Sequence, residues 1–163
     1  MLIRSGWEIK TEYRDIIDSI LETKILPRQI DVVILGIAIG ITNDKYAEPV
    51  GDENLSIPYN TLNKSDIIQT VDYLYQTAIL TSSESKKLFD ENERLQLAFD
   101  DDHEEEGFNK NRFLIGFSTY GIKYICQNLY NKEDNVFYDN LKMYIVNELN
   151  KINSKNIALT DLG

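Results

Sequence analysis

The stretch Val32-Val33-Ile34-Leu35-Gly36-Ile37-Ala38-Ile39-Gly40-Ile41 decides the fold of this chain. It has no polar face, so its side chains must be enclosed on every side. A buried strand of a parallel sheet would have the same composition, but the length of the segment from Ile30 to Ile41 favours a buried central helix. Gly36 and Gly40 are four residues apart, so on a helix they share one side and allow a neighbouring helix to pack closely.

The sequence on both sides of this stretch has the three- and four-residue apolar spacing of amphipathic helices. We predict helices at residues 8–23, 65–80, 91–99, 109–130 and 135–152, and a short helix that Ser82 or Ser83 caps. Residues 42–63 contain proline and glycine turn signals, and they predict a long connection with room for a short extended segment at residues 55–59.

The predicted fold class is therefore all-α, with about six helices around the buried central helix. The chain has 163 residues, of which 42% are hydrophobic and 27% charged, as in an ordinary globular domain. We predict a single helical domain at residues 1–152 and a flexible tail at residues 153–163.

The cysteine count and the lengths of the apolar runs limit which classes of protein this chain can belong to. The one cysteine, Cys126, excludes a disulfide framework and a zinc site of several thiolates within the chain. It follows apolar neighbours, so we expect it to be a small buried side chain. The N-terminus has no apolar core of signal-peptide length. The longest apolar run is about half the roughly twenty residues that a membrane helix needs, so we expect a cytoplasmic location and no membrane partner.

The charge balance narrows the choice of partners. The chain has 27 acidic and 17 basic residues, which gives a net charge of −10. Such a charge repels phosphate backbones, so we do not expect direct binding to nucleic acid. It is compatible with binding to a basic protein, or with imitation of DNA.

No familiar catalytic pattern is present in the sequence. His103 is the only histidine, so a nucleophile system based on histidine has to use it, and it lies in a charged segment where nothing fixes its ring. The GxSxG, HExxH and GxxxxGK[ST] patterns are missing. A pair of carboxylates such as Asp31 and Glu48 could still meet in space. We expect no enzyme and no cofactor.

The densest feature is the acidic run from Asp100 to Glu106. It could form a solvated loop, contact a basic partner, or hold a hard cation. The glycine and the closing glutamate of a calcium loop are missing, so we expect no metal site. Trp7 is a second candidate anchor, because tryptophan is frequent at interface hot spots. The candidate partner-binding residues are Trp7, Asp100, Asp101, Asp102, Glu104, Glu105 and Glu106.

Residues 28–80 carry a family resemblance. The segments Arg28 to Ile41, Ile57 to Leu62 and Asp66 to Leu80 resemble the small helical accessory proteins of bacterial DNA-phosphorothioation (Dnd-type) and related anti-phage defence loci. The resemblance implies a non-enzymatic subunit that docks on a larger ATPase or nuclease. Two alternatives remain open: a phage-type inhibitor whose acidic face imitates DNA, and an enzyme with an unrecognised carboxylate site.

Overall fold

The apolar stretch forms a helix, as predicted. A computed structural model describes residues 3–100, 103, 105–131 and 136–160, with the backbone alone for 155–160. In it, helix α2 (Gln29–Thr42) has seven buried residues. It starts where the Asp31 carboxylate accepts the Arg28 N–H at 3.0 Å and pairs with the Arg28 guanidinium at 2.6 Å. It ends where the Asn43 amide donates to the Ile39 carbonyl at 2.8 Å.

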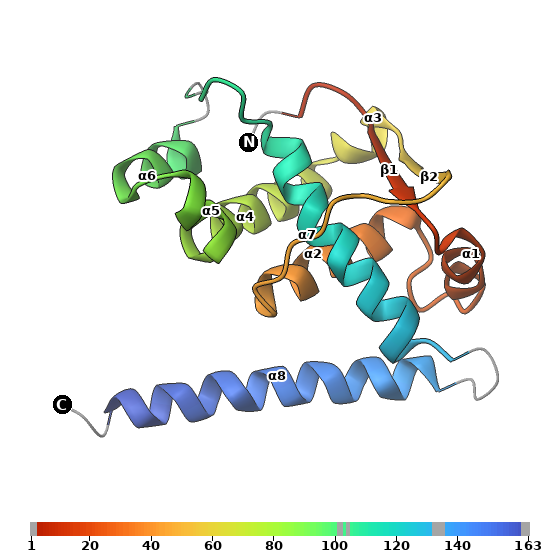
Figure 1. Ribbon diagram of the computed structural model, residues 1–163. Coiled ribbons are helices and arrows are strands. Elements are labelled where there is room, and N and C mark those ends of the chain that lie inside the picture. Colours follow the sequence, from red (N-terminus) through yellow and green to blue (C-terminus); the bar gives the residue numbers. More distant parts are fainter. Residues whose placement is uncertain (1–2, 101–102, 104, 132–135, 161–163) are drawn as a thin grey trace.

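Helix α2 crosses α7 (Lys110–Tyr124) at the centre of the molecule (Figure 1). Glycines allow the two backbones to touch. A Cβ atom on Gly121 would lie 1.9 Å from the Gly36 carbonyl oxygen, and one on Gly40 would lie 2.3 Å from that of Phe117. Such distances are far inside van der Waals contact, so the crossing requires glycine at these positions. The predicted role of Gly36 and Gly40 in close packing is therefore confirmed.

The helix predicted at residues 8–23 is wrong in its first part. Strand β1 (Trp7–Thr11) occupies that part, and α1 (Arg14–Glu22) follows it. β1 pairs antiparallel with β2 (Glu53–Ile57), with Trp7 opposite Ile57 and Ile9 opposite Leu55. Alternate residues of β1 are buried against the helices, which a strand allows and a helix does not. β2 confirms an extended segment in the long connection, slightly earlier than residues 55–59.

The remaining helices agree well with the predicted ranges, except α3 (Tyr59–Leu62), which is a short helix inside the predicted connection at residues 42–63. The others are α4 (Ser65–Thr81), α5 (Ser83–Leu88), α6 (Glu91–Phe99) and α8 (Phe137–Thr160). The helix predicted at 109–130 is α7 followed by a π-helical turn, η1 (Ile125–Leu129). Helix α8 continues beyond the predicted end at residue 152. The described chain is thus mostly helical, with a small two-stranded sheet.

The core lies between these elements. It includes the largest fully buried side chains, which come from α1, α2, α3, α4, α7, α8 and both strands, among them Tyr75, Phe117, Phe137, Ile37 and Leu55. Cys126 is buried, as predicted. Over the described residues, no helix combines the length and the apolar character needed to cross a membrane.

Candidate protein-binding surface

Helix α6 has apolar residues on two sides, and only one side faces the core. Its start is fixed by a capping box, in which the Glu93 N–H donates to Asp90 at 2.9 Å and the Asp90 N–H to Glu93 at 2.8 Å. Leu97 and Ala98 are buried. Leu95 and Phe99, four residues apart on the other side, are 44% and 66% exposed. Leu95 and Phe99 therefore form an apolar pair at the surface of α6.

Acidic residues dominate the sequence on both sides of this exposed pair. From Asp90 to Glu106 the only lysine or arginine is Arg94, whose guanidinium donates to the Leu80 carbonyl at 2.9 Å. Asp100 directly follows Phe99 and forms the C-terminal cap of α6. The Asp100 carbonyl accepts the His103 N–H at 3.2 Å. We call the set of Leu95, Phe99, Asp100, Glu105 and Glu106, which follow one another closely in the sequence, the acidic edge.

The predicted acidic residues fall partly in this surface. Asp100 and Glu106 are exposed. Glu105 is half-buried and lies 2.8 Å from the His103 ring nitrogen Nε2, which fixes that ring locally. Asp101, Asp102 and Glu104 lie outside the described residues. The acidic run therefore continues from an apolar exposed pair, which the charge pattern alone did not reveal.

Leu95 and Phe99 are the residues that sequence reasoning missed. The predicted helix at residues 91–99 has Leu95, Leu97, Ala98 and Phe99 as its apolar residues, with no distinction between its two sides. At 100° per residue, however, Leu97 projects nearly opposite Leu95. A short helix that packs on the core with one side cannot bury apolar residues on its opposite side as well. The two-residue step from Leu95 to Leu97 is the sequence signal that could have shown this.

Trp7, the other candidate anchor, is buried in the described chain and not exposed at its surface. Its side chain is 2% exposed and lies on β1 opposite Ile57. The alternating burial of the strand turns Trp7 and Ile9 to the same side, toward the core. A partner could reach this ring only by opening the sheet.

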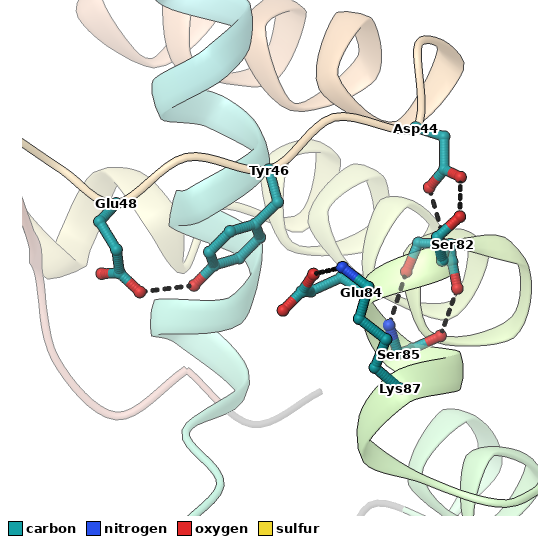
Figure 2. A network of polar contacts seen from close by, with 8 residues as sticks. Asp44, Tyr46, Glu48, Ser82, Glu84, Ser85 and Lys87 are labelled. Atoms are coloured by element: carbon teal, nitrogen blue, oxygen red, sulfur yellow. Dashed lines mark hydrogen bonds and ion pairs between the residues drawn. The ribbon is translucent and has the colours of Figure 1, made fainter.

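A polar network ties the segment after α2 to α5. Figure 2 shows Asp44 pointing from the end of α2 toward the turn before α5. Its carboxylate accepts the Ser83 N–H at 2.8 Å and also the Ser83 hydroxyl. Ser82 in turn caps α5 by accepting the Ser85 N–H at 3.1 Å. Partial burial opposes ionisation of Asp44, but the hydrogen bonds from Ser83 and the charges of Lys86 and Lys45 outweigh it, so its pKa is lowered.

We expect Asp44→Ala to lower the free energy of unfolding by about 1 kcal/mol at neutral pH, because two hydrogen bonds to Ser83 are lost. Asp44 also has a positive φ of 50°, which alanine tolerates poorly and asparagine tolerates well. Asp44→Asn is therefore the milder variant. Since the folded-state pKa is lowered, the contribution of Asp44 is present above the ordinary carboxyl pKa of about 4 and is lost as the pH falls through the lowered pKa. Urea unfolding at neutral pH and near pH 3 checks this, and an undiminished difference between wild type and Asp44→Ala at low pH would contradict it.

Burial keeps several reactive side chains protonated. It raises the pKa of the Cys126 thiol to about 12, and it is the main reason that the pKa of the Tyr13 hydroxyl is raised to about 12. Burial also raises the pKa of Tyr75. Thiols and phenols become nucleophiles or bases when their pKa is lowered, so these shifts run opposite to activation.

The carboxylates considered for paired catalysis are separated. Asp31 lies in the first turn of α2 and pairs with Arg28. Glu48 lies beyond the other end of α2 and pairs with Arg112 at 3.1 Å. Within the described part of the chain, no three His, Cys, Asp or Glu residues are grouped so that they could hold a metal ion.

A small pocket lies between β1, the segment after α2, and α7. It has a volume of about 90 Å³ and a mostly apolar lining that includes Ile9, Val50 and Ile122. Two larger and more open hollows have volumes of about 590 and 330 Å³; Tyr124, Tyr144 and Lys151 line the first, and Tyr46, Phe108 and Arg112 line the second. No protein-family model matches the chain, and no match is found among curated proteins or solved structures.

Proposed function

We propose that this chain is a non-catalytic accessory subunit that binds a larger protein through the acidic edge. The observation that carries the proposal is Phe99, an aromatic side chain two-thirds exposed and directly followed by the acidic run. Leaving such a ring in water is unfavourable unless a partner covers it, because burial of a large apolar side chain contributes roughly 2 kcal/mol.

The chemistry of the acidic edge specifies the partner. Carboxylates at Asp100, Glu105 and Glu106 attract lysine and arginine side chains. The ring of Phe99 can accept an arginine guanidinium on its face, while Leu95 packs against an apolar side chain. A basic amphipathic helix or strand of the partner, with an apolar residue between arginines, satisfies both requirements.

The cellular setting in this proposal comes from the resemblance of residues 28–80. That resemblance supports a bacterial defence or DNA-maintenance complex in the cytoplasm, with an ATPase or nuclease as the larger subunit. Because proteins of that kind bind DNA through basic surfaces, an acidic accessory protein is electrostatically suited to them. The net charge of −10 also favours one alternative, a phage-type inhibitor that occupies the DNA site of its target.

Affinity capture from the source cell tests the proposal. We expect the wild-type chain to retain a larger protein and Phe99→Ser to bind it at least about tenfold more weakly, as for a hot-spot residue. Tyr59→Ser is the matched control, since Tyr59 is another exposed aromatic residue, on α3, away from α6 in Figure 1. Equal retention by Phe99→Ser and wild type would refute the role of the acidic edge.

Neutralising the carboxylates of the acidic edge distinguishes their contribution to partner binding from that of the apolar side chains. We expect Asp100→Asn/Glu105→Gln/Glu106→Gln to weaken partner binding at low salt and to have little effect in about 0.5 M salt, where exposed charges are screened. Binding assays at both salt concentrations measure this. Competition between DNA and the chain for the captured partner would identify the inhibitor alternative, and simultaneous binding of both would identify the accessory subunit.

A further inference from the structure

A hollow beside the start of α7 has both aromatic and charged side chains in its lining. Its volume is about 330 Å³, which lies within the range of small-molecule sites. The segment after α2, helix α5 and the start of α7 each contribute to it. We call it the aromatic hollow, and its main lining residues are Tyr46, Glu84, Leu88, Phe108, Arg112 and Phe113. It shares no residue with the acidic edge.

The aromatic rings of the hollow are in contact with one another. The centroids of the Phe108 and Phe113 rings lie 5.4 Å apart, and those of Tyr46 and Phe113 lie 6.3 Å apart. Phe113 therefore joins the other two rings into one apolar wall. Leu88, at the end of α5, is 53% exposed and adds an aliphatic side chain to the lining. Such a lining suits the apolar part of a ligand.

Tyr46 is held in position by the backbone around it. The Lys45 N–H donates to the Gly40 carbonyl at 2.9 Å, and the Ala47 N–H donates to the Gly116 carbonyl at 3.1 Å. A Cβ atom on Gly116 would lie 2.1 Å from the Tyr46 ring, so the ring packs directly against the backbone of α7. Figure 2 shows the segment with Tyr46 running across this helix. A ring fixed in advance lowers the entropy that a ligand has to remove on binding.

Two opposite charges lie in the same lining. The Arg112 guanidinium pairs with Glu48 at 3.1 Å, and Glu84 pairs with Lys87 at 2.9 Å. The side chains of Arg112 and Lys87 are 71% and 69% exposed, and ion pairs this exposed contribute little, so a ligand can replace either partner. Burial is the main cause of the raised pKa of the Tyr46 hydroxyl. The charges of Glu48, Arg112 and Glu84 also act on that pKa, so all three lie near this hydroxyl.

Each part of the lining matches one group of an α-amino acid. A guanidinium binds a carboxylate through two hydrogen bonds, and Arg112 lies in the first turn of α7, where the helix dipole also favours an anion. The Glu84 carboxylate attracts an ammonium group. The aromatic wall and Leu88 cover an apolar side chain. A ligand with a single charge would use only one of the two charged residues. We propose that the aromatic hollow binds a free α-amino acid with an apolar side chain.

Titration of the full chain with L-phenylalanine, followed by amide NMR shifts, tests the proposal. We expect saturable shifts at residues 46–48, 84–88 and 108–113, with a Kd below about 1 mM. N-acetyl-L-phenylalanine lacks the ammonium group and L-phenylalaninamide lacks the carboxylate. Each should bind at least about tenfold more weakly, because one charged residue of the hollow then has no partner in the ligand. Equal binding of either derivative would show that the hollow takes a peptide terminus and would overturn the proposal.

Charge-neutral variants assign the two contacts. Arg112→Gln and Glu84→Gln should each weaken L-phenylalanine binding at least about tenfold, and their circular dichroism should be unchanged, since both ion pairs are at the surface. Glu91→Gln is the matched control for Glu84→Gln. Glu91 also lies in the first turn of a helix, α6, but not in the lining of the hollow, so this variant should bind like the wild type. Equal weakening by both glutamate variants would refute a contact with Glu84.

A comparison of amino acids completes the test. L-leucine should bind within about tenfold of L-phenylalanine, whereas L-glutamate should bind much more weakly, because its second carboxylate would enter the apolar wall. Phe99→Ser should bind L-phenylalanine like the wild type, so the result is independent of partner binding at the acidic edge. The proposal would be overturned if neither L-phenylalanine nor L-leucine gave saturable shifts up to about 10 mM, or if the shifts lay outside the hollow.

Discussion

Gly40→Ala and Gly121→Ala are each expected to lower the free energy of unfolding by about 3 kcal/mol or more. An added Cβ would lie 2.3 Å from the Phe117 carbonyl oxygen in the first variant and 1.9 Å from that of Gly36 in the second. Both contacts are with backbone, so α2 and α7 must separate along their whole crossing. A glycine-to-alanine substitution inside a helix ordinarily raises the free energy of unfolding by about 1 kcal/mol through helix propensity. A lowered free energy of unfolding would therefore indicate the backbone clash.

The neighbouring glycines provide graded controls for this measurement. In Gly36→Ala the new Cβ would lie 3.0 Å from the Ser118 carbonyl oxygen, so a small shift relieves the contact and the loss should be clearly smaller. Gly107 has open space around it but a φ of +78°, so Gly107→Ala should cost only about 1 kcal/mol from backbone strain. Urea unfolding followed by Trp7 fluorescence ranks the four variants. Similar stability of Gly121→Ala and Gly36→Ala would show that the helices do not cross as described.

Trp7→Ala is expected to cost about 4 kcal/mol, in the range for deletion of a large buried aromatic side chain. Trp7 is almost fully enclosed between the sheet and the helices. The indole Nε1 has no hydrogen-bond acceptor among the described residues. Trp7→Phe removes that unsatisfied donor and keeps most of the ring, so it should cost only about 1 kcal/mol.

Circular dichroism during urea unfolding measures both variants, since the fluorescent residue is the one replaced. Phe99→Ala is the control, because Phe99 is exposed and its loss should change stability by less than about 0.5 kcal/mol. The pattern would be reversed if Trp7 were a surface anchor. A Trp7→Ala variant as stable as the wild type would restore the view that Trp7 faces a partner.

The central helix could be predicted because its signal is strong and local. Ten consecutive residues without a polar side chain have to be buried, and the four-residue spacing of Gly36 and Gly40 indicates close contact on one side. The partner in that contact could not be predicted. Gly121 lies 85 residues beyond Gly36 (121 − 36), and no local pattern joins the two.

The failure at residues 8–23 has a different cause. Ile9 and Tyr13 are four apart, which fits a helix, while Trp7, Ile9 and Thr11 alternate, which fits a strand. The choice depends on Leu55 and Ile57, which lie opposite in β2. A strand that forms only because a distant strand pairs with it leaves little trace in its own sequence.

The acidic charge of the candidate surface was predicted from the sequence, but its exposed apolar residues were not. The acidic run pointed to a basic partner, and the described members of the run do flank an exposed region. The exposed side of α6 required knowledge of which side packs on α4.

Hydrogen exchange on the complex isolated from the source cell tests the central claim most directly. The account predicts that amides from about residue 91 to residue 106 exchange more slowly in the complex than in the free chain, because the partner covers Leu95 and Phe99. Unchanged exchange there, with slowed exchange confined to other parts of the chain, would contradict binding through this surface.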